Sequence, residues 1–522
     1  MVKLGDWAAA VLAVAVLAAG SARAQEEAAK PLKPTEAAQS AAGVLALLPA
    51  EPSTTRHELR LGGRSLAYRA TAGTLPLRDS SGEVTAQVFH VAYALEEPGT
   101  PDRPVTFLFN GGPGAASAFL MLGGVGPRTV AFSEAGGYLP PPSRLVDNPD
   151  TWLAFTDLVF VDPVGTGYSR AAESGEEADR RFFGVRQDAS AMAAFIRLWL
   201  AREGRTLSPV FLAGESYGGF RAAVLAHALQ EESGITPSGV VLISPALEFS
   251  LLREEEFTLL PWAVSLPSMV AVHLERQGTD PADLGSRLEE VERFALSDYL
   301  VSLAAGPDGL DPGIVATLAR VTGLPPELVR QSYGRISVSR FIKEYDRASR
   351  QVLSRYDGTV SGPDPDPASP NPGGPDPVLD RAVPVWTSAF VAYAREELGF
   401  ETDVTYRLLN PELAGNWDYG TSPSRQGYAG ALDELQAART LSPSLQILIA
   451  NGYADLVTPY FASRYLVDQL PPLAGAAPIE LAVYPGGHMM YTRPESRRAL
   501  KEDARLLYRR ALTPAASETS DG

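Results

Sequence analysis

The sequence predicts an α/β fold with a mostly parallel central sheet and a helical cap insertion. Short apolar runs of strand length alternate with longer segments in which apolar residues recur every three or four positions, the spacing of one helix face. This alternation stops near residue 248 and returns near residue 385, so a segment of different architecture interrupts the sheet. With 522 residues, of which 45% are hydrophobic, the chain is long enough to bury such a core.

Residues 56–247 carry the first part of the predicted core. Alternating apolar residues at 57–94 predict antiparallel strands at one edge of the sheet. Buried strands are then expected at 105–109, 157–161, 209–213 and 239–246, and helices at 182–200 and 217–232. Because strands and helices alternate in this stretch, helices are expected to cover both faces of the sheet.

Residues 248–384 form the predicted cap, and residues 385–512 the second part of the core. The cap contains helical segments at 283–300 and 312–321 and no clear strand, and its Pro-, Gly- and Asp-rich residues 361–377 predict an exposed loop. The sheet pattern returns with strands at 445–450 and 479–484 and helices at 459–470 and 494–511. An insertion after a sheet strand is expected to lie over the site.

The two ends of the chain have the composition of segments outside the core. Residues 1–24 combine Lys3, an apolar run at 8–20 and small residues up to Ala24, which predicts a secretory signal cleaved after Ala24. The alternative is an uncleaved membrane anchor, but the run is shorter than the roughly 20 residues that a span needs. We therefore expect a periplasmic or secreted protein with no stable membrane insertion, a flexible leader at 25–55 and a disordered tail at 513–522.

Charge and cysteine content exclude several functions. The formal net charge of −17, without a Lys/Arg-rich run, would repel nucleic acid and anionic membranes. The chain has no cysteine, which excludes disulfides, a thiolate nucleophile and a Cys-ligated metal. No cluster of histidines and carboxylates predicts a metal site, and no cofactor is expected.

Residues 214–218, Gly-Glu-Ser-Tyr-Gly, lie between the strand at 209–213 and the helix that starts at 217. A strand, a sharp turn and a helix form the nucleophile elbow of serine hydrolases, which exposes Ser216 at its tip. Gly214 and Gly218 are needed there because a side chain would collide with neighbouring backbone. The alternative is an ordinary turn in which the serine caps the helix.

Two further motifs follow the last two strands, and they supply Asp455 and His488. In the α/β-hydrolase fold the triad appears in the order Ser, Asp, His, each on a turn after a strand, and Ser216, Asp455 and His488 satisfy both conditions. The other histidines lie in expected strands, helices or the cap and are expected to be structural or exposed: His57, His90, His227 and His273.

These residue types predict acyl transfer. His488 would take the proton of Ser216, and Asp455 would hold the imidazole in the required tautomer. Two backbone amides must stabilise the oxyanion, and the candidates are Tyr217, directly after the nucleophile, and Gly112, in the glycine-rich loop after the strand at 105–109.

Four motifs together resemble the serine carboxypeptidase family and occur in its order. They are Asn-Gly-Gly-Pro-Gly at 110–114, Asp-Pro-Val-Gly-Thr-Gly-Tyr-Ser at 162–169, Gly-Glu-Ser-Tyr-Gly-Gly at 214–219 and Gly-His-Met at 487–489. The resemblance implies an exported serine-type carboxypeptidase whose substrate is a peptide with a free C-terminus. It also implies that Asn110, Gly111 and Glu215 bind the terminal carboxylate of that substrate.

Glu215 is an unusual neighbour for a nucleophile because its negative charge opposes the oxyanion. The residue makes sense if it is protonated and shares its proton with a carboxylate. The alternative is a solvated turn residue, or a partner of Arg221. The chain also departs from the family: a second glutamate often precedes the Gly-Pro pair, and Gly124 stands there.

Other functions remain open at this point. The same triad would serve an aminopeptidase of the proline iminopeptidase kind, an esterase or an acyltransferase. An aminopeptidase needs carboxylates facing a substrate ammonium, and an esterase needs neither Asn110 nor Glu215. A non-catalytic exported binding protein is the least favoured, because Ser216, Asp455 and His488 are all present.

Overall fold

The computed structural model describes residues 43–96, 103–255, 257–420 and 429–513. The predicted signal segment with cleavage after Ala24, most of the predicted leader and all of the predicted tail except Thr513 lie outside these residues. Within them, β1 begins at Ser53 and Leu48 is buried, so the structured core begins before the predicted end of the leader at residue 55. None of the helices in the described ranges is long and apolar enough to cross a membrane.

A ten-stranded sheet forms the centre of the molecule, in the order β1-β2-β3-β7-β4-β9-β10-β13-β14, with β8 paired to β3. The first strands are antiparallel, as predicted, and the sheet is parallel from β7 to β14. The strands are β1 (Ser53–Leu61), β2 (Arg64–Arg78), β3 (Val84–Leu95), β4 (Val105–Phe109), β7 (Asp157–Val161), β8 (Arg170–Ala171), β9 (Val210–Glu215), β10 (Gly239–Ile243), β13 (Gln446–Gly452) and β14 (Ile479–Tyr484).

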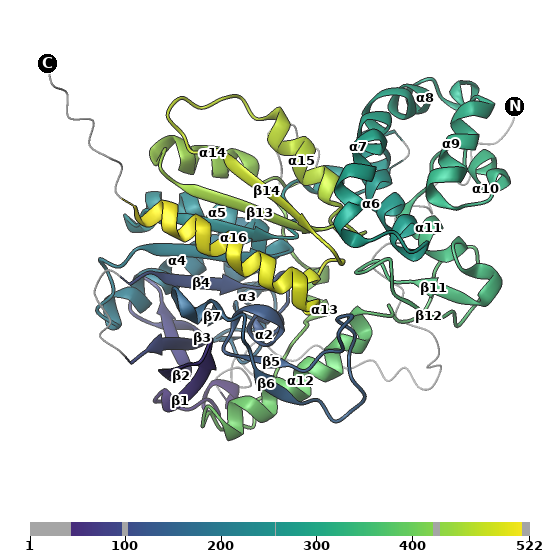
Figure 1. Ribbon diagram of the computed structural model, residues 1–522. Coiled ribbons are helices and arrows are strands. Elements are labelled where there is room, and N and C mark those ends of the chain that lie inside the picture. Colours follow the sequence, from purple (N-terminus) through teal and green to yellow (C-terminus); the bar gives the residue numbers. More distant parts are fainter. Residues whose placement is uncertain (1–42, 97–102, 256, 421–428, 514–522) are drawn as a thin grey trace, which may run out of the picture.

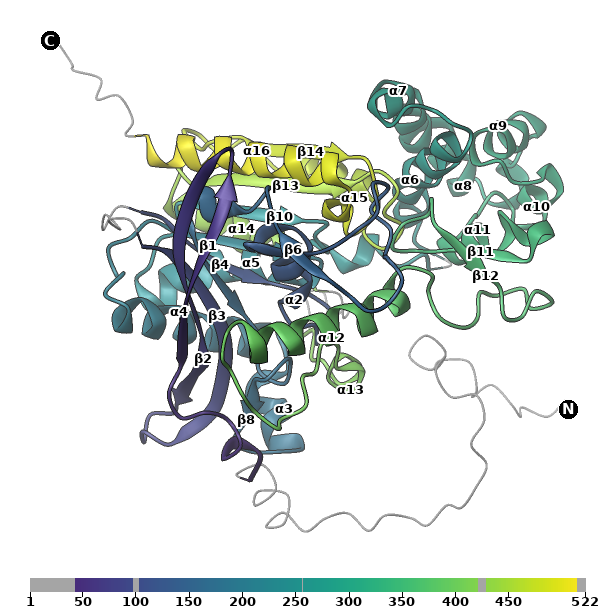
Figure 2. The same cartoon turned by 60° about the horizontal axis from the view of Figure 1, so that its bottom comes forward.

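Helices cover both faces of the sheet, as the sequence predicts (Figures 1 and 2). Neighbouring residues of β4 belong to different cores. Phe107 lies in the core that includes residues of α4, α5, α14 and α15, and Leu108 lies in the core that includes residues of α12 and α16. Strands buried on both faces explain the continuous apolar runs in the sequence. The helices are α4 (Val185–Arg202), α5 (Tyr217–Ser233), α12 (Leu379–Glu396), α14 (Leu432–Leu441), α15 (Tyr460–Gln469) and α16 (Pro494–Leu512).

Short elements connect these layers. A hairpin formed by β5 and β6 follows the glycine-rich loop and packs near α12 (Figure 1). The elements are α2 (Ala118–Leu120), η1 (Met121–Val125), β5 (Arg128–Val130), β6 (Leu145–Asp147), η2 (Trp152–Ala154), α3 (Glu176–Phe182), α13 (Pro411–Gly415) and η8 (Met490–Thr492).

The insertion between β10 and α12 gathers at one side of the sheet (Figure 1). Its elements are η3 (Phe249–Leu251), α6 (Leu260–Arg276), η4 (Pro281–Asp283), α7 (Leu284–Phe294), η5 (Ala295–Tyr299), α8 (Leu300–Ala304), η6 (Pro307–Gly309), α9 (Pro312–Thr322), α10 (Pro326–Gln331), α11 (Val338–Glu344), η7 (Arg347–Ser349), β11 (Gln351–Leu353) and β12 (Ser361–Pro363).

Two features of the insertion differ from the prediction. The antiparallel pair β11–β12 was not expected, because three-residue strands are too short to show an alternating pattern. Residue 384, the predicted end of the insertion, lies inside α12, which begins at Leu379 and continues through Pro384. The predicted boundary between the insertion and the second part of the core therefore falls within a helix.

Candidate active site

Ser216 occupies a strained turn between β9 and α5. Its φ of 60° and ψ of −125° lie in a region that non-glycine residues rarely adopt. A Cβ atom on Gly214 would lie 1.9 Å from the Gly218 carbonyl oxygen, and one on Gly218 would lie 2.4 Å from the Phe109 carbonyl oxygen. The reason given for glycine at both positions is thus confirmed. The Ser216 side chain forms no capping hydrogen bond with α5, so the alternative of a capping serine is wrong.

Asp455 and His488 follow two strands that are parallel neighbours, β13 and β14, so their turns meet at one sheet edge. His488 Nδ1 lies 2.8 Å from Asp455 Oδ2, and both side chains are buried. Thr458 Oγ1 donates to Asp455 Oδ2 at 2.7 Å, and the amides of Val457 and Thr458 donate to Oδ1 at 2.8 and 3.0 Å. These bonds fix the carboxylate against the imidazole.

The pKa of His488 is set by opposing effects. Burial lowers it, but the neighbouring Asp455 carboxylate, its hydrogen bond and the charge of Glu215 raise it above the ordinary histidine value. The protonated imidazole is therefore stabilised, as an acid–base catalyst between serine and leaving group requires.

The end of β10 connects the turn of Ser216 with the turn of His488. The Ser216 amide donates to the Ile243 carbonyl at 2.9 Å, and the next residue, Ser244, donates its hydroxyl to the His488 carbonyl at 2.8 Å. The structure thus brings all three predicted residues to one sheet edge. In the described residues the Asp455–His488 contact is formed, whereas Ser216 Oγ forms no hydrogen bond to His488 or to any other described group. Such bonds are often long without substrate.

The two predicted oxyanion amides belong to the elbow, which carries Tyr217, and to the glycine-rich loop, which carries Gly112. A Cβ atom on Gly111 would lie 2.5 Å from the Tyr217 nitrogen and 2.8 Å from Ser216 Cβ, so the glycine-rich loop packs directly on the elbow. Gly112 has a φ of 99°, which favours glycine. Over the described parts of the chain, neither the Gly112 amide nor the Tyr217 amide donates a hydrogen bond. Both are therefore available to a ligand.

Glu215 is the last residue of β9 and is 3% exposed. Asn110 Nδ2 donates to Glu215 Oε2 at 2.5 Å, and the Tyr491 hydroxyl donates to the same oxygen at 2.8 Å. The Leu120 amide donates to Asn110 Oδ1 at 2.9 Å and so fixes which end of the Asn110 amide faces Glu215. Glu215 and Asn110 form one polar cluster next to Ser216.

The alternative interpretations of Glu215 are wrong. The residue is buried rather than solvated, and Arg221 pairs instead with Asp188, with Arg221 Nε and Asp188 Oδ2 2.5 Å apart. Burial raises the pKa of Glu215 to about 7, although His488, Tyr491 and Asn110 lower it. The carboxyl group can therefore hold or release a proton near neutral pH.

Tyr491 is a site residue that the sequence analysis missed. A Cβ atom on Gly123 would lie 2.5 Å from Tyr491 Cε2, and one on Gly124 would lie 3.0 Å from Tyr491 Cβ. The tyrosine ring thus covers the place where the family often has a second glutamate, and its hydroxyl supplies a hydrogen bond to Glu215. The signal was the Gly-Gly pair at 123–124, which leaves room for a ring.

Tyr138, on the hairpin between β5 and β6, was also missed. Its hydroxyl is buried and has no hydrogen-bond partner among the described residues. Burial first, and then the charges of Glu215, Asp376 and Asp357, raise its pKa above the ordinary tyrosine value. An unpaired buried hydroxyl can donate to a ligand.

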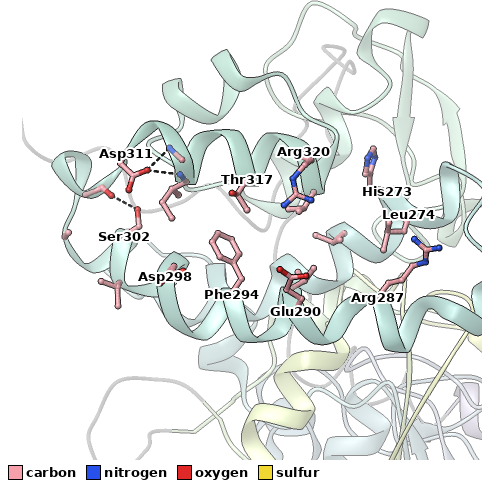
Figure 3. Close-up of a pocket in the computed structure, with 18 of the residues that line it drawn as sticks. His273, Leu274, Arg287, Glu290, Phe294, Asp298, Ser302, Asp311, Thr317 and Arg320 are labelled. Atoms are coloured by element: carbon pink, nitrogen blue, oxygen red, sulfur yellow. Dashed lines mark hydrogen bonds between the residues drawn. The ribbon is translucent and has the colours of Figure 1, made fainter.

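The remaining candidates lie elsewhere. His57, His90, His227 and His273 lie in β1, β3, α5 and α6, as expected. In the described part of the chain no group of three or more His, Cys, Asp or Glu side chains could hold a metal ion. A cavity of about 960 Å³ lies between α6, α7, α8 and α9, with Phe294 and Thr317 facing it from two of these helices (Figure 3), but it contains none of the predicted site residues.

Comparison with known proteins points to one family. Residues 68–238 match the family model described as serine carboxypeptidase, a range that contains Asn110, Glu215 and Ser216. The chain is 30% identical to serine carboxypeptidase-like 46 of Arabidopsis thaliana over 173 residues, which are 32% of this chain and 34% of that protein. It is 31% identical to the pheromone-processing carboxypeptidase KEX1 of Yarrowia lipolytica over 144 residues, which are 27% of this chain and 21% of that protein.

The matches cover a limited part of each relative. The chain spans about a third or less of the length of these curated relatives. Among solved structures, VinJ aligns over 84% of this chain and 98% of its own at 14% identity, with a TM-score of 0.34 that adds nothing to the fold assignment. The strand order, the parallel pairing from β7 to β14 and the helices on both faces identify the fold as that of the α/β hydrolases. Over residues 68–238, about a third of its length, the chain is similar to the serine carboxypeptidase family.

Proposed function

We propose that the protein is an exported serine carboxypeptidase that hydrolyses the C-terminal peptide bond of peptides. The observation that carries this proposal is the buried cluster of Glu215 and Asn110 directly beside Ser216. A carboxyl group that is protonated near neutral pH and an amide donor together fit a substrate carboxylate.

The position of this cluster defines the bond that is cut. With the terminal carboxylate held by protonated Glu215, the Asn110 side chain and the Gly111 amide, the last peptide bond lies over Ser216. A residue beyond that position would replace the terminal carboxylate with a neutral peptide group, which cannot share a proton with Glu215. The enzyme would therefore remove single residues from the C-terminus.

The chemical steps follow from the triad geometry. His488 Nδ1 faces Asp455, so Nε2 is the nitrogen that takes the Ser216 proton as Oγ attacks the carbonyl carbon. The amides of Tyr217 and Gly112 would stabilise the oxyanion. His488 then protonates the leaving amine, and a water molecule, activated by the same imidazole, hydrolyses the acyl-enzyme.

The competing activities fit less well. An aminopeptidase would need ionised carboxylates facing an ammonium group, whereas Glu215 has a raised pKa and an amide donor beside it. Burying the carboxyl group of Glu215 costs free energy, and an esterase or acyltransferase would not need this residue to bind its substrate. A binding protein without catalysis would not need the strained backbone of Ser216.

The decisive experiment compares dipeptides that carry a blocked or a free amino terminus, each with a free, amidated or esterified carboxyl terminus. We expect rapid cleavage of the free acid, cleavage of the amide slowed by at least about 10²-fold because a charged hydrogen-bond partner is lost, and no need for a free amino terminus. Faster cleavage of substrates with a free amino terminus would support an aminopeptidase, and a preference for the ester alone would support an esterase.

Ser216→Ala is the control for all of these activities. Because triad members act as a unit, we expect the variant to lose about 10⁶-fold in kcat. Near-normal activity of this variant would remove Ser216 from the mechanism.

Export is tested separately, by sequencing the amino terminus of protein recovered outside the cytoplasm, which should begin at Gln25.

A further inference from the structure

One loop of the insertion lies between the two turns that carry Asp455 and His488. Residues 354–359, which join β11 to β12, form three backbone hydrogen bonds with these turns. They are His488 N to Tyr356 O at 2.6 Å, Leu456 N to Arg355 O at 3.0 Å and Gly358 N to Ala454 O at 3.0 Å. The loop therefore contacts the acid turn and the base turn at the same time.

The packing at this contact leaves no free space. A Cβ atom on Gly487 would lie 2.0 Å from the Tyr356 carbonyl oxygen and 2.5 Å from Asp357 Cα. The Tyr356 ring stands edge-on to the His488 ring, with centroids 5.4 Å apart and planes at 87°. A shift of the loop would thus move the imidazole with it.

The loop is itself held in one shape. Ser354 Oγ and the Arg355 amide donate to the two oxygens of Asp376 at 2.6 and 3.0 Å. The Asp357 carboxylate accepts hydrogen bonds from the amide and hydroxyl of Thr359 at 3.0 and 2.5 Å. These hydrogen bonds, within the loop and to Asp376, hold the loop backbone in one conformation.

Arg493 fastens this loop to the segment that carries His488. The residue lies five positions after His488, is 9% exposed, and reaches three partners in the insertion. Its Nη1 donates to Glu275 Oε1 of α6 at 2.7 Å, and its Nη2 donates to Thr359 Oγ1 at 3.0 Å and to Asp357 Oδ2 at 3.3 Å. Removing this side chain would leave two partly buried carboxylates, those of Glu275 and Asp357, without their cation.

We propose that the loop at 354–359 positions His488 and Asp455 for catalysis and that Arg493 is the positioning residue that locks it in place. The inference rests on the proposed roles of those two residues. It assigns the insertion a part in building the site, in addition to lying beside it.

The test compares Arg493→Met with Arg493→Lys and with a matched control, Glu292→Gln. Glu292 of α7 accepts from Arg464 Nη1 at 2.7 Å and from the Tyr460 hydroxyl at 2.8 Å, both on α15. It thus joins the insertion to the core without touching the catalytic turns. Each variant is assayed for kcat and KM on a free-acid dipeptide and for its rate of labelling by a fluorophosphonate, which reports the nucleophilicity of Ser216 without any carboxylate recognition.

We expect Arg493→Met to lower kcat and the labelling rate by about 10²-fold, the effect of a small misplacement of catalytic groups. KM should stay within about threefold, Arg493→Lys should recover part of the loss, and Glu292→Gln should stay within about twofold of wild type in all three quantities. If Arg493→Met does not fold, Asp357→Asn weakens the same contact without a change of shape and should lose about tenfold in the labelling rate.

Two results would overturn the inference. One is a labelling rate within about twofold of wild type for Arg493→Met, or for Asp357→Asn in its place. The other is an equal loss for Glu292→Gln, which would show that any contact between insertion and core matters alike. If wild type is labelled but does not cleave the dipeptide, the proposed function fails while the labelling comparison still tests the loop.

Discussion

The Glu215 carboxyl group and the His488 imidazole have opposite needs in the proposed reaction. Glu215 must carry a proton to donate to a carboxylate, whereas His488 must be without one to act as a base. The charge of each group also influences the pKa of the other: Glu215 raises that of His488, and His488 lowers that of Glu215. The two groups therefore titrate as a coupled pair.

The first prediction concerns the pH profile of kcat/KM. Activity should fall as pH rises through the pKa of Glu215, about 7, because the ionised carboxylate repels the substrate carboxylate. It should also fall as pH decreases through the pKa of His488, which lies above the ordinary histidine value, because the protonated imidazole is no base. The profile should be bell-shaped. Glu215→Gln, which donates at every pH, should flatten the alkaline limb and, because it removes a charge that raises the pKa of His488, move the acid limb to lower pH. A flat profile for wild type from about pH 4 to 8 would contradict both roles.

The second prediction concerns Tyr491, whose hydroxyl lowers the pKa of Glu215 by donating to its carboxylate. Tyr491→Phe keeps the ring on Gly123 and Gly124 but removes this donor, so the alkaline limb should move to higher pH. The control is Tyr93→Phe, a buried tyrosine whose hydroxyl lies 3.1 Å from the Tyr393 hydroxyl. An alkaline limb that moves equally in both variants, or in neither, would exclude a specific effect of Tyr491.

At the scale of elements, close backbone contacts shape the site. The elbow requires Gly218 because the Phe109 carbonyl oxygen lies where its side chain would be. Gly415, at the end of α13, is exposed and has open space around its Cβ position. Both glycines lie in helices, but only the Cβ position of Gly218 meets other atoms. A Gly→Ala substitution at Gly415 is therefore a matched control for one at Gly218.

The third prediction uses this pair. Gly218→Ala should lower the free energy of unfolding by about 1–3 kcal/mol, since the added methyl group meets rigid backbone. Gly415→Ala should leave it unchanged or raise it by up to about 1 kcal/mol, through the lower entropy of the unfolded chain. Denaturant titration measures both, and an equal effect in the two variants would show that the elbow tolerates the added methyl group.

The same scale explains what the sequence could predict. The strands, the turn motifs that carry Ser216, Asp455 and His488, and the collision at Gly214 each depend on local spacing and are visible in a short window of the sequence. Tyr491 and Glu215 lie 276 positions apart, and their contact depends on how two loops meet in space. The loop at 354–359 was hidden for the same reason, and its flanking strands have only three residues each. Contacts between loops that are distant in the chain produce no periodic pattern of apolar residues, so the sequence alone does not reveal them.

At the scale of the whole molecule, the formal net charge of −17 surrounds a site that is proposed to bind an anionic group. The negative electrostatic potential of the protein opposes the approach of the substrate carboxylate. The hydrogen-bond donors of the proposed site must compensate for this repulsion. Basic side chains elsewhere in a peptide would offset this repulsion. The charge of the substrate should therefore matter even where it touches no residue of the site.

The fourth prediction follows from that field. We expect kcat/KM for an acetylated peptide with two lysines before its last residues to fall by about tenfold when salt is raised, because screening removes the attraction. A peptide of the same length with two glutamates should become a better substrate under the same change, and one with two glutamines should change least. Chloride and sulfate salts at equal ionic strength separate screening from specific ion binding. Parallel slopes for the three peptides would mean that the net charge has no part in substrate capture, and that recognition depends only on the groups around Glu215.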